Sequence, residues 1–407
     1  MSNATVLAGV GLLASAFLSA HASAQDAAPA PANTGAAAEP LQDVVVTAQF
    51  RSEPVQETPL AITAIGSQQL EEQGLSRITD ITNSAPNVVM KPSGSVYGPA
   101  ATLFIRGVGQ MDSSFAVDPG VGIYVDDVYR GITFGSLLDL LDLDRVEILR
   151  GPQGTLAGKN SIGGAVKLYS KRPDGEGGGY LEATTGSFDR LDAKGAGNFT
   201  LVPDSLFMRI SAVTRHHDGY LTRYDFNCAH PSGPVAPTSM GSNGDCKIGT
   251  EGGQDYTAGR VALRWLASDA VEVNLAADRL DDDSEPTATK LISLNSAAAT
   301  TPGITDRSVF LTGPEAYSNY SNYAIQPFTD PAIYAGRPGA GSHPAMTFPT
   351  NNRIRAWDLA GSVDVRLTQT LSLKSITGYQ DTDGRYSTDN DTTPFGISTA
   401  VFAMKYR

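Results

Sequence analysis

Cysteine, positive charge and long apolar runs are all scarce in this sequence, and each shortage excludes something. The 407 residues include 30 Lys or Arg against 43 Asp or Glu, so the net charge is −13. This balance argues against a nucleic-acid partner, because a nucleic-acid surface needs a basic patch that releases phosphate counterions. The sequence has no internal run of about 18 apolar residues, so no transmembrane helix is expected.

Small residues are plentiful instead. The 42 glycines and the low charged fraction of 18% fit a loop-rich β protein better than a helical one. Residues 1–24 have the pattern of an export signal, with an apolar stretch and an A-x-A site before the cut, although the opening MSNAT carries no Lys or Arg. Residues 25–42 are rich in Ala and Pro and are expected to form a flexible linker.

The two cysteines, Cys228 and Cys246, lie in one segment with the composition of a loop. In an exported protein this arrangement favours a disulfide. A metal site with the nearby His230 is the alternative, but two cysteines and one histidine at this spacing do not match the usual zinc patterns. We therefore predict a disulfide and no metal.

A short β-branched segment, DVVVTAQF at 43–50, follows the linker. Such residues prefer an extended backbone, and a short strand on a tether has little of its own to pack against. Two interpretations stay open: the segment adds as a strand to the sheet edge of another protein, or it is the first strand of the next domain.

Residues 54–175 are predicted to form an α+β domain. A short helix is expected with Ser67 as N-cap and Gly74 as C-cap, and a second helical turn over 78–83 before Pro86. Period-2 patterning and glycine-rich turns predict strands at 60–65, 102–106, 122–125, 145–149 and 165–170.

The glycine-rich stretch after the strand at 145–149, RGPQGTLAGKN, raises the possibility of a phosphate loop. A P-loop requires four residues between its glycines and then Lys and Ser or Thr. Only three residues separate Gly154 from Gly158, and Asn160 replaces the hydroxyl residue. The glycines therefore indicate sharp turns and close packing, and Lys159 is expected to be solvated or salt-bridged.

From Gly178 onward, stretches of about ten residues alternate between apolar and polar. The connections between them are unequal: three tight turns, at 203–205, 268–270 and 368–370, alternate with long loops over roughly 219–255 and 284–353. This asymmetry predicts a transmembrane β-barrel, whereas a soluble sandwich has no reason to sort its loops by length. Trp265 beside a tight turn and Trp357 beside a long loop fit the aromatic girdles of such a barrel.

Four segments resemble signatures of the TonB-dependent outer-membrane receptors. DVVVTAQF is similar to the TonB box; LFIRGVG, GIYVDDVYRG and DRVEILRGPQGTLAGKNSIGGAVKLYSKRP are similar to successive motifs of the plug domain. The resemblance implies an α+β plug followed by a transmembrane antiparallel β-barrel of about 22 strands. It also implies import of a scarce solute, most often a ferric siderophore, with cobalamin, haem, other metal complexes, sugars or aromatic compounds as alternatives. The resemblance further implies that energy comes from the inner-membrane proton gradient, relayed by TonB, and that the receptor acts as a monomer in outer-membrane lipid.

The resemblance also assigns roles to single residues. Arg106 and Arg150 would form ion pairs with barrel-wall glutamates beyond residue 407, the simpler alternative being strand-end charges that face water. The residues that would bind TonB are Asp43, Val44, Val45, Val46, Thr47 and Ala48. The outward tips of the plug, which would contact the ligand, offer Tyr97, Gln110, Met111, Asp112 and Phe115.

The length of the chain departs from the family pattern. Residues 178–407 hold about seven predicted strands, the last near 371–384, whereas only a barrel of about 22 strands can hold a plug. We therefore expect an incomplete barrel, and a sequence that is a truncated version of a longer protein.

A passive porin is disfavoured because it would lack the box and plug. A signalling transducer is disfavoured because the linker of 18 residues leaves no room for its additional N-terminal domain.

No catalytic machinery or cofactor site is predicted. The sequence has no G-x-S-x-G elbow. The acidic runs Asp126–Asp127 and 281–283 are interpreted as solvated surface. His216 and His217 are interpreted as a solvent-exposed pair at the outer end of a strand.

Overall fold

The structure is a computed structural model. It describes residues 45–47, 53–75, 77–93, 99–111, 117–131, 142–232, 244–293, 315–325, 346–390, 392–394 and 399–407. The predicted export signal and linker lie outside these ranges, as do Asp43, Val44, Ala48, Tyr97, Asp112 and Phe115. No helix among the described residues has both the length and the apolar character needed to cross a membrane.

Among its described residues, the first domain contains two small sheets and three short helices. Its five-stranded sheet has the order β3-β9-β10-β7-β8, and its three-stranded sheet has the order β4-β5-β6. The strands are β3 (Ile62–Gly66), β4 (Val88–Pro92), β5 (Ala101–Ile105), β6 (Val108–Gln110), β7 (Val121–Val125), β8 (Val128–Arg130), β9 (Leu143–Arg150) and β10 (Gly164–Ser170). The helices are α1 (Ser67–Glu72), the 3₁₀ helix η1 (Ile78–Ser84) and α2 (Gly154–Ala157).

All five strands expected in this domain are present, whereas β4, β6 and β8 were not predicted. The N-cap prediction for α1 was wrong: Gly66 is the N-cap, Ser67 is the first helical residue, and no side chain caps the end. Gly74 lies one residue beyond the C-cap and has a positive φ of 62°. Leu75 N–H then bonds to the Leu70 carbonyl at 2.9 Å, the 6→1 bond of a Schellman ending.

The core of the first domain lies on one face of the five-stranded sheet. Val146 and Ile148 of β9 and Val166 and Leu168 of β10 alternate with residues on the opposite face, and all four are buried. The helices α1 and η1 and the strands β4 and β5 complete this core through apolar side chains such as Ile78. The opposite face carries a smaller apolar cluster of Tyr124, Leu149 and Ala165, next to buried charged residues.

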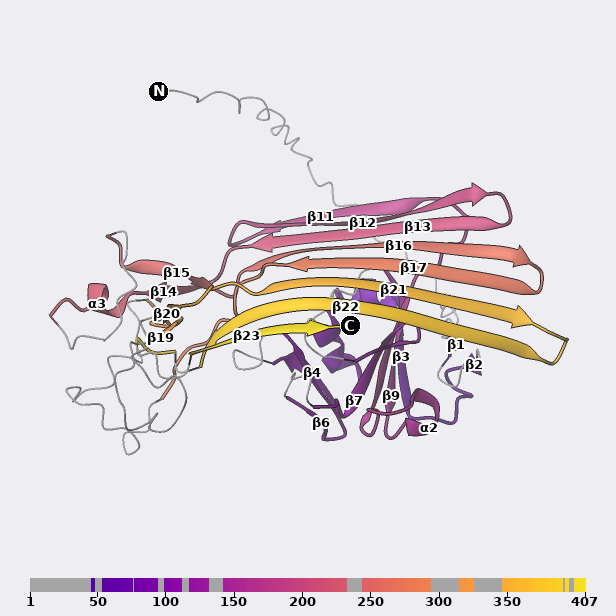
Figure 1. The fold of residues 1–407 in the computed structure, drawn as a ribbon, viewed down its shortest axis with the longest axis horizontal. Helices are drawn as coiled ribbons and strands as arrows, with labels where there is room; N and C mark the ends of the chain where they lie inside the picture. Colours follow the sequence, from indigo (N-terminus) through magenta and orange to yellow (C-terminus); the bar gives the residue numbers. More distant parts are fainter. Residues whose placement is uncertain are drawn as a thin grey trace, which may run out of the picture. The chain divides into compact units, whose positions relative to one another are not determined.

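The second part of the chain is a long antiparallel sheet of eight strands, here called the long sheet. Its order is β11-β12-β13-β16-β17-β21-β22-β23. The strands are β11 (Gly179–Gly186), β12 (Arg190–Val202), β13 (Leu206–His217), β16 (Gln254–Ser268), β17 (Val271–Asp282), β21 (Arg353–Arg366), β22 (Ser372–Asp389) and β23 (Thr399–Tyr406). Figure 1 shows them side by side, with the tight turns after β12, β16 and β21 at one end and the longer loops, together with the short β11–β12 turn, at the other. The three predicted tight turns are confirmed, and they lie at the end opposite the long loops.

The two faces of the long sheet differ as the alternation predicts. Along β13 the even-numbered residues from Leu206 to Ala212 point outward, while Arg209, Ser211 and Arg215 are buried on the inner face. Trp265 and Trp357 are both about half exposed, at 49% and 51%. The outer face is thus apolar and uncovered, which suits contact with lipid rather than water.

The long sheet has one strand more than expected. The additional strand is β23, which pairs with β22 from Thr382↔Tyr406 to Asp389↔Thr399. Among the described strands, β11 and β23 each have a single neighbour, so the sheet does not close on itself there. This is the architecture of a partial barrel wall.

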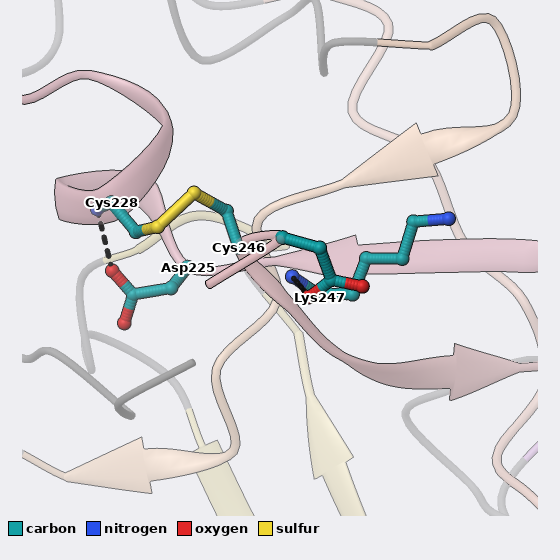
Figure 2. The surroundings of a disulfide bond; sticks show 5 residues. Asp225, Cys228, Cys246 and Lys247 are labelled. Atoms are coloured by element: carbon teal, nitrogen blue, oxygen red, sulfur yellow. Dashed lines mark hydrogen bonds between the residues drawn. A yellow bond between two sulfur atoms is a disulfide. The ribbon is translucent and has the colours of Figure 1, made fainter. Parts of the chain in front are cut away.

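The loop end of the long sheet holds a small folded cap. Its elements are β14 (Leu221–Tyr224), α3 (Phe226–Ala229), β15 (Lys247–Glu251), β18 (Ser318–Asn319), β19 (Ala324–Ile325) and β20 (Met346–Thr347). Cys228 in α3 and Cys246 form a disulfide with a Cα–Cα distance of 5.4 Å, and Asp225 caps α3 by accepting from the Cys228 N–H (Figure 2). Glu251 is fully buried and accepts hydrogen bonds from Asn319 at 3.0 Å and Tyr323 at 3.2 Å.

Candidate functional site

The face of the five-stranded sheet opposite its core carries buried charges. Arg145 and Glu147 of β9 and Lys167 and Tyr169 of β10 lie there, and β9 and β10 place Glu147 opposite Lys167 and Arg145 opposite Tyr169. Glu147 is 0% exposed and Lys167 is 3% exposed. Buried charges are costly unless they are paired, so the contacts of this face define what it does.

The segment that precedes the first domain is docked on this face. Its described residues, 45–47, are called the docked segment, and Val45–Val46 forms β1, which pairs antiparallel with β2 (Glu53–Pro54). Thr47 N–H donates to Glu147 Oε1 at 2.9 Å, and Arg145 Nη2 donates to Thr47 Oγ1 at 2.8 Å. Val46 is 1% exposed. The docked segment is therefore held by the domain as a short strand, through one carboxylate and one guanidinium.

Tyr169 links this docking point to the turn between β7 and β8. Its hydroxyl donates to Asp127 Oδ1 at 2.8 Å, and the Arg145 guanidinium carbon lies 3.9 Å from the centre of its ring. Burial raises the pKa of Tyr169 well above its ordinary value, and the neighbouring carboxylate of Asp127 adds to this shift. The phenol therefore keeps its proton and serves as a hydrogen-bond donor.

Ion pairs join the β7–β8 turn to the inner face of the long sheet. Arg260 of β16 pairs with Asp126, and also with Asp278 of β17 at 2.9 Å. Arg130 of β8 pairs with Asp358 of β21. We call these five residues the charge ladder. The adjoining Asp127 pairs with Lys167 at 3.5 Å and lies 3.8 Å from Lys374 of β22.

The prediction that Asp126–Asp127 is solvated surface was therefore wrong. Both carboxylates face cations that lie between 40 and roughly 250 residues away in sequence, which a reading along the chain does not bring together. The other acidic run is also ion-paired, because Arg355 contacts both Asp281 and Asp283. A usable signal did exist: Arg260 and Asp278 are charges in the middle of alternating strands, on the face opposite the apolar one.

A second anchor lies at the start of β9. Arg209 of β13 donates to both carboxylate oxygens of Asp142 at 2.6 Å, and both side chains are less than one-tenth exposed. Two parallel charge-assisted hydrogen bonds of this kind fix orientation as well as distance. The first domain is thus attached to the long sheet here as well as at the charge ladder.

A cavity of about 370 Å³ lies between the first domain and the long sheet. The charge ladder lines it through Arg130, Arg260, Asp278 and Asp358, and Tyr256 and Gln380 add an aromatic and an amide surface. A mixed lining of this kind suits a polar solute with some apolar surface. The cavity is therefore a candidate solute chamber, and the sequence did not point to it.

The predicted ligand residues do not meet in this cavity. Gln110 and Met111, the two that the structure describes, are absent from its lining, and Met111 is half exposed. His217 does line the cavity, whereas His216 is half exposed and faces Asp218. Among the described residues no group of three or more His, Cys, Asp or Glu side chains has the arrangement of a metal site.

Arg106 and Arg150 end their strands as the sequence indicates. Arg106 has a positive φ of 54°, and its N–H donates to the Asn87 carbonyl at 2.8 Å. The Arg150 N–H donates to the Ala61 carbonyl at 2.9 Å, and its Nε is buried without a hydrogen-bond partner in the described part of the chain. Neither guanidinium has an ion-pair partner within the described ranges, so their role stays a prediction. Lys159 is exposed and lies 3.6 Å from Asp118, as expected.

Comparison with known proteins identifies the first domain. The family model for the TonB-dependent receptor plug domain matches residues 54–165. These residues are a TonB-dependent receptor plug. The first domain is hereafter called the plug, and the long sheet is called the wall.

Curated relatives match about two fifths of this chain. The chain is 29% identical over 167 residues to the pesticin receptor of Yersinia pestis, which covers 41% of this chain and 24% of that receptor. It is 29% identical over 157 residues to the vitamin B12 transporter BtuB of Vibrio vulnificus, covering 39% of this chain and 24% of the transporter. The chain therefore matches about a quarter of the length of these relatives.

Solved structures are similar to this chain over both the plug and the wall. The ferric yersiniabactin uptake receptor FyuA of Yersinia pestis superposes with a TM-score of 0.57 at 20% identity, covering 81% of this chain and 42% of that receptor. At this identity the likeness establishes the fold: a plug followed by part of a β-barrel wall. The predicted fold class is confirmed.

Proposed function

We infer that this chain belongs to an energy-coupled importer in the outer membrane of a Gram-negative bacterium. The observation that carries the proposal is the docked segment, a β-branched strand placed directly before a plug and held to it by few contacts. A strand in this position is suited to pair with the sheet edge of TonB once it is released. A passive porin has no use for either the plug or such a strand.

The wall supplies the membrane-spanning part of the importer. Its outer face is apolar and its inner face carries the ladder residues that hold the plug. Outer-membrane lipid is the partner of the outer face, and TonB with its inner-membrane complex is the partner of residues 43–50. The receptor works as a monomer, with the plug and residues 43–50 accessible from the periplasm, and we assign it no catalytic step.

The solute class that we propose is a ferric siderophore or a related iron complex. The relatives and the structural neighbour include a pesticin receptor and a ferric yersiniabactin uptake receptor, and ferric chelates are polar solutes that suit a mixed lining. A cobalamin-like solute is the second candidate, because a vitamin B12 transporter is similar to this chain to the same degree of identity, 29%.

The test uses the full-length gene in a strain from which the native copy is deleted. Removing residues 43–50 should abolish uptake of radioactive ferric chelates while cell-surface binding of the same chelates persists. Cyanocobalamin, offered in parallel, tests the second candidate. Uptake that continues without residues 43–50 would contradict energy coupling through this segment.

A further inference from the structure

We propose that Tyr169 is a positioning residue that couples the ion pairs between plug and wall to the docking of residues 45–47. The proposal rests on the proposed function in one respect only: it takes the docked segment as the point at which energy is coupled. Its physical content is a continuous set of side-chain contacts from the cavity lining to Thr47.

The first step runs from the wall to the β7–β8 turn. Asp126 and Asp127 are the two central residues of this hairpin turn, since Val125 pairs directly with Val128. Both have positive φ, 49° and 65°, a conformation that residues other than glycine rarely adopt. The turn is therefore held in place by its surroundings. Arg260 holds Asp126, and Lys374 lies beside Asp127.

The second step runs from the turn to Tyr169. Ser170 N–H and Oγ both donate to Asp126, at 2.9 and 3.0 Å, so the end of β10 is tied to the turn. The Tyr169 hydroxyl has one proton, and it donates that proton to Asp127. A shift of the turn that accompanies a change in the charge ladder must therefore either move the phenol or break this bond.

The third step runs from Tyr169 to the docked segment. The ring of Tyr169 lies against the Arg145 guanidinium, whose carbon is 3.9 Å from the ring centre. Arg145 in turn holds both Thr47 Oγ1 and Glu147 Oε1, at 2.8 and 2.9 Å. Tyr169 thus contacts both Asp127 and Arg145, one of the two side chains that bind Thr47. Because the ladder also lines the cavity, a solute bound there would act on the same ion pairs.

The test measures how often the docked segment opens. Val46→Cys places a thiol at a position that is 1% exposed, and Cys228 and Cys246 are joined in a disulfide, so within residues 1–407 the new thiol is the one that is free to react with a maleimide reagent. The full-length receptor is labelled in isolated outer membranes without solute. The labelling rate of a buried thiol follows the population of the open state when opening is fast relative to labelling.

Tyr169→Phe should raise the labelling rate about tenfold, the effect of losing one hydrogen bond to a charged partner. Phe keeps the ring and its packing, so a purely structural role predicts no change. Lys374→Gln, on the wall, should raise the rate in the same direction by about two- to threefold. Lys159→Gln, which removes an exposed ion pair elsewhere on the plug, is the matched control and should leave the rate unchanged.

Glu147→Gln removes the charge of the carboxylate that accepts the Thr47 N–H, and it is the positive control for a change in the labelling rate of the Val46→Cys thiol. If Glu147→Gln raises the rate while Tyr169→Phe does not, the proposal is wrong. If Tyr169→Phe acts but Lys374→Gln does not, the link to the wall is wrong. Neither result touches the proposed function, because deletion of residues 43–50 tests import without reference to Tyr169.

Discussion

Arg209→Met is the substitution that most directly tests how the plug is held to the wall. It removes two hydrogen bonds of 2.6 Å and leaves Asp142, a carboxylate that is 7% exposed, without its counter-charge. Breaking a buried ion pair from one side costs about 3–5 kcal/mol. Adding Asp142→Asn should restore most of this loss, because no uncompensated charge then remains. Asparagine also tolerates the positive φ of 56° at that position.

The loss can be read as a shift in urea midpoint. With a denaturant slope of about 2 kcal/mol per molar urea, a loss of about 4 kcal/mol lowers the midpoint of plug unfolding by about 2 M. Pulse proteolysis of the full-length receptor in detergent micelles measures the unfolded fraction at each urea concentration. Lys159→Gln serves as the exposed-pair control. The reasoning fails if Arg209→Met shifts the midpoint no more than this control, or if the double variant is as unstable as the single one.

Three further predictions concern the cap and the contact between plug and wall. Burial raises the pKa of Glu251 from 4.5 to about 7, so the folded cap holds a proton that the unfolded chain releases. Cap stability is therefore greatest below pH 4.5 and declines as the pH rises through about 7; Glu251→Gln should flatten this dependence in limited proteolysis of the loops at a series of pH values. Reducing the Cys228–Cys246 disulfide, which spans 18 residues, should cost the cap about 3 kcal/mol, measured as faster loop cleavage in dithiothreitol; unchanged cleavage would show that the bridge does not stabilise it. Gly378→Leu places a side chain where the wall approaches Val128 of the plug, so it should expose the plug to protease, whereas Gly378→Ala should do so less.

Much of the fold could be predicted from local sequence signals. The period-2 alternation of β13, β16 and β21 fixes which face is apolar, because a one-residue change of register would invert every side chain. The positions of the tight turns and long loops follow from where this alternation stops and starts again. The strand β23 was missed because the expected end of the wall was set at 371–384, although its own sequence, TAVFAMKY, is compatible with a strand.

The site was less accessible to sequence reasoning. The motif around Tyr124 to Arg130 marks the plug, but motif recognition assigns no partner to Asp126 or Asp127. Their cations come from wall strands whose spacing along the chain carries no information about distance in space. The prediction of the N-cap of α1 was wrong for a different reason. Ser67 has the right chemistry for an N-cap, but the strand β3 continues through Gly66, and the helix therefore starts at Ser67 itself.

Several contacts that hold the plug are made with wall strands that follow it closely in the chain. Asp142 is held by β13, Asp126 by β16 and Arg130 by β21, while Lys374 of β22 lies beside Asp127. The plug and these strands therefore carry matching charges as soon as both have been synthesised. These contacts need no strand later than β22, so the plug can meet its partners on the wall before any later part of the protein is made.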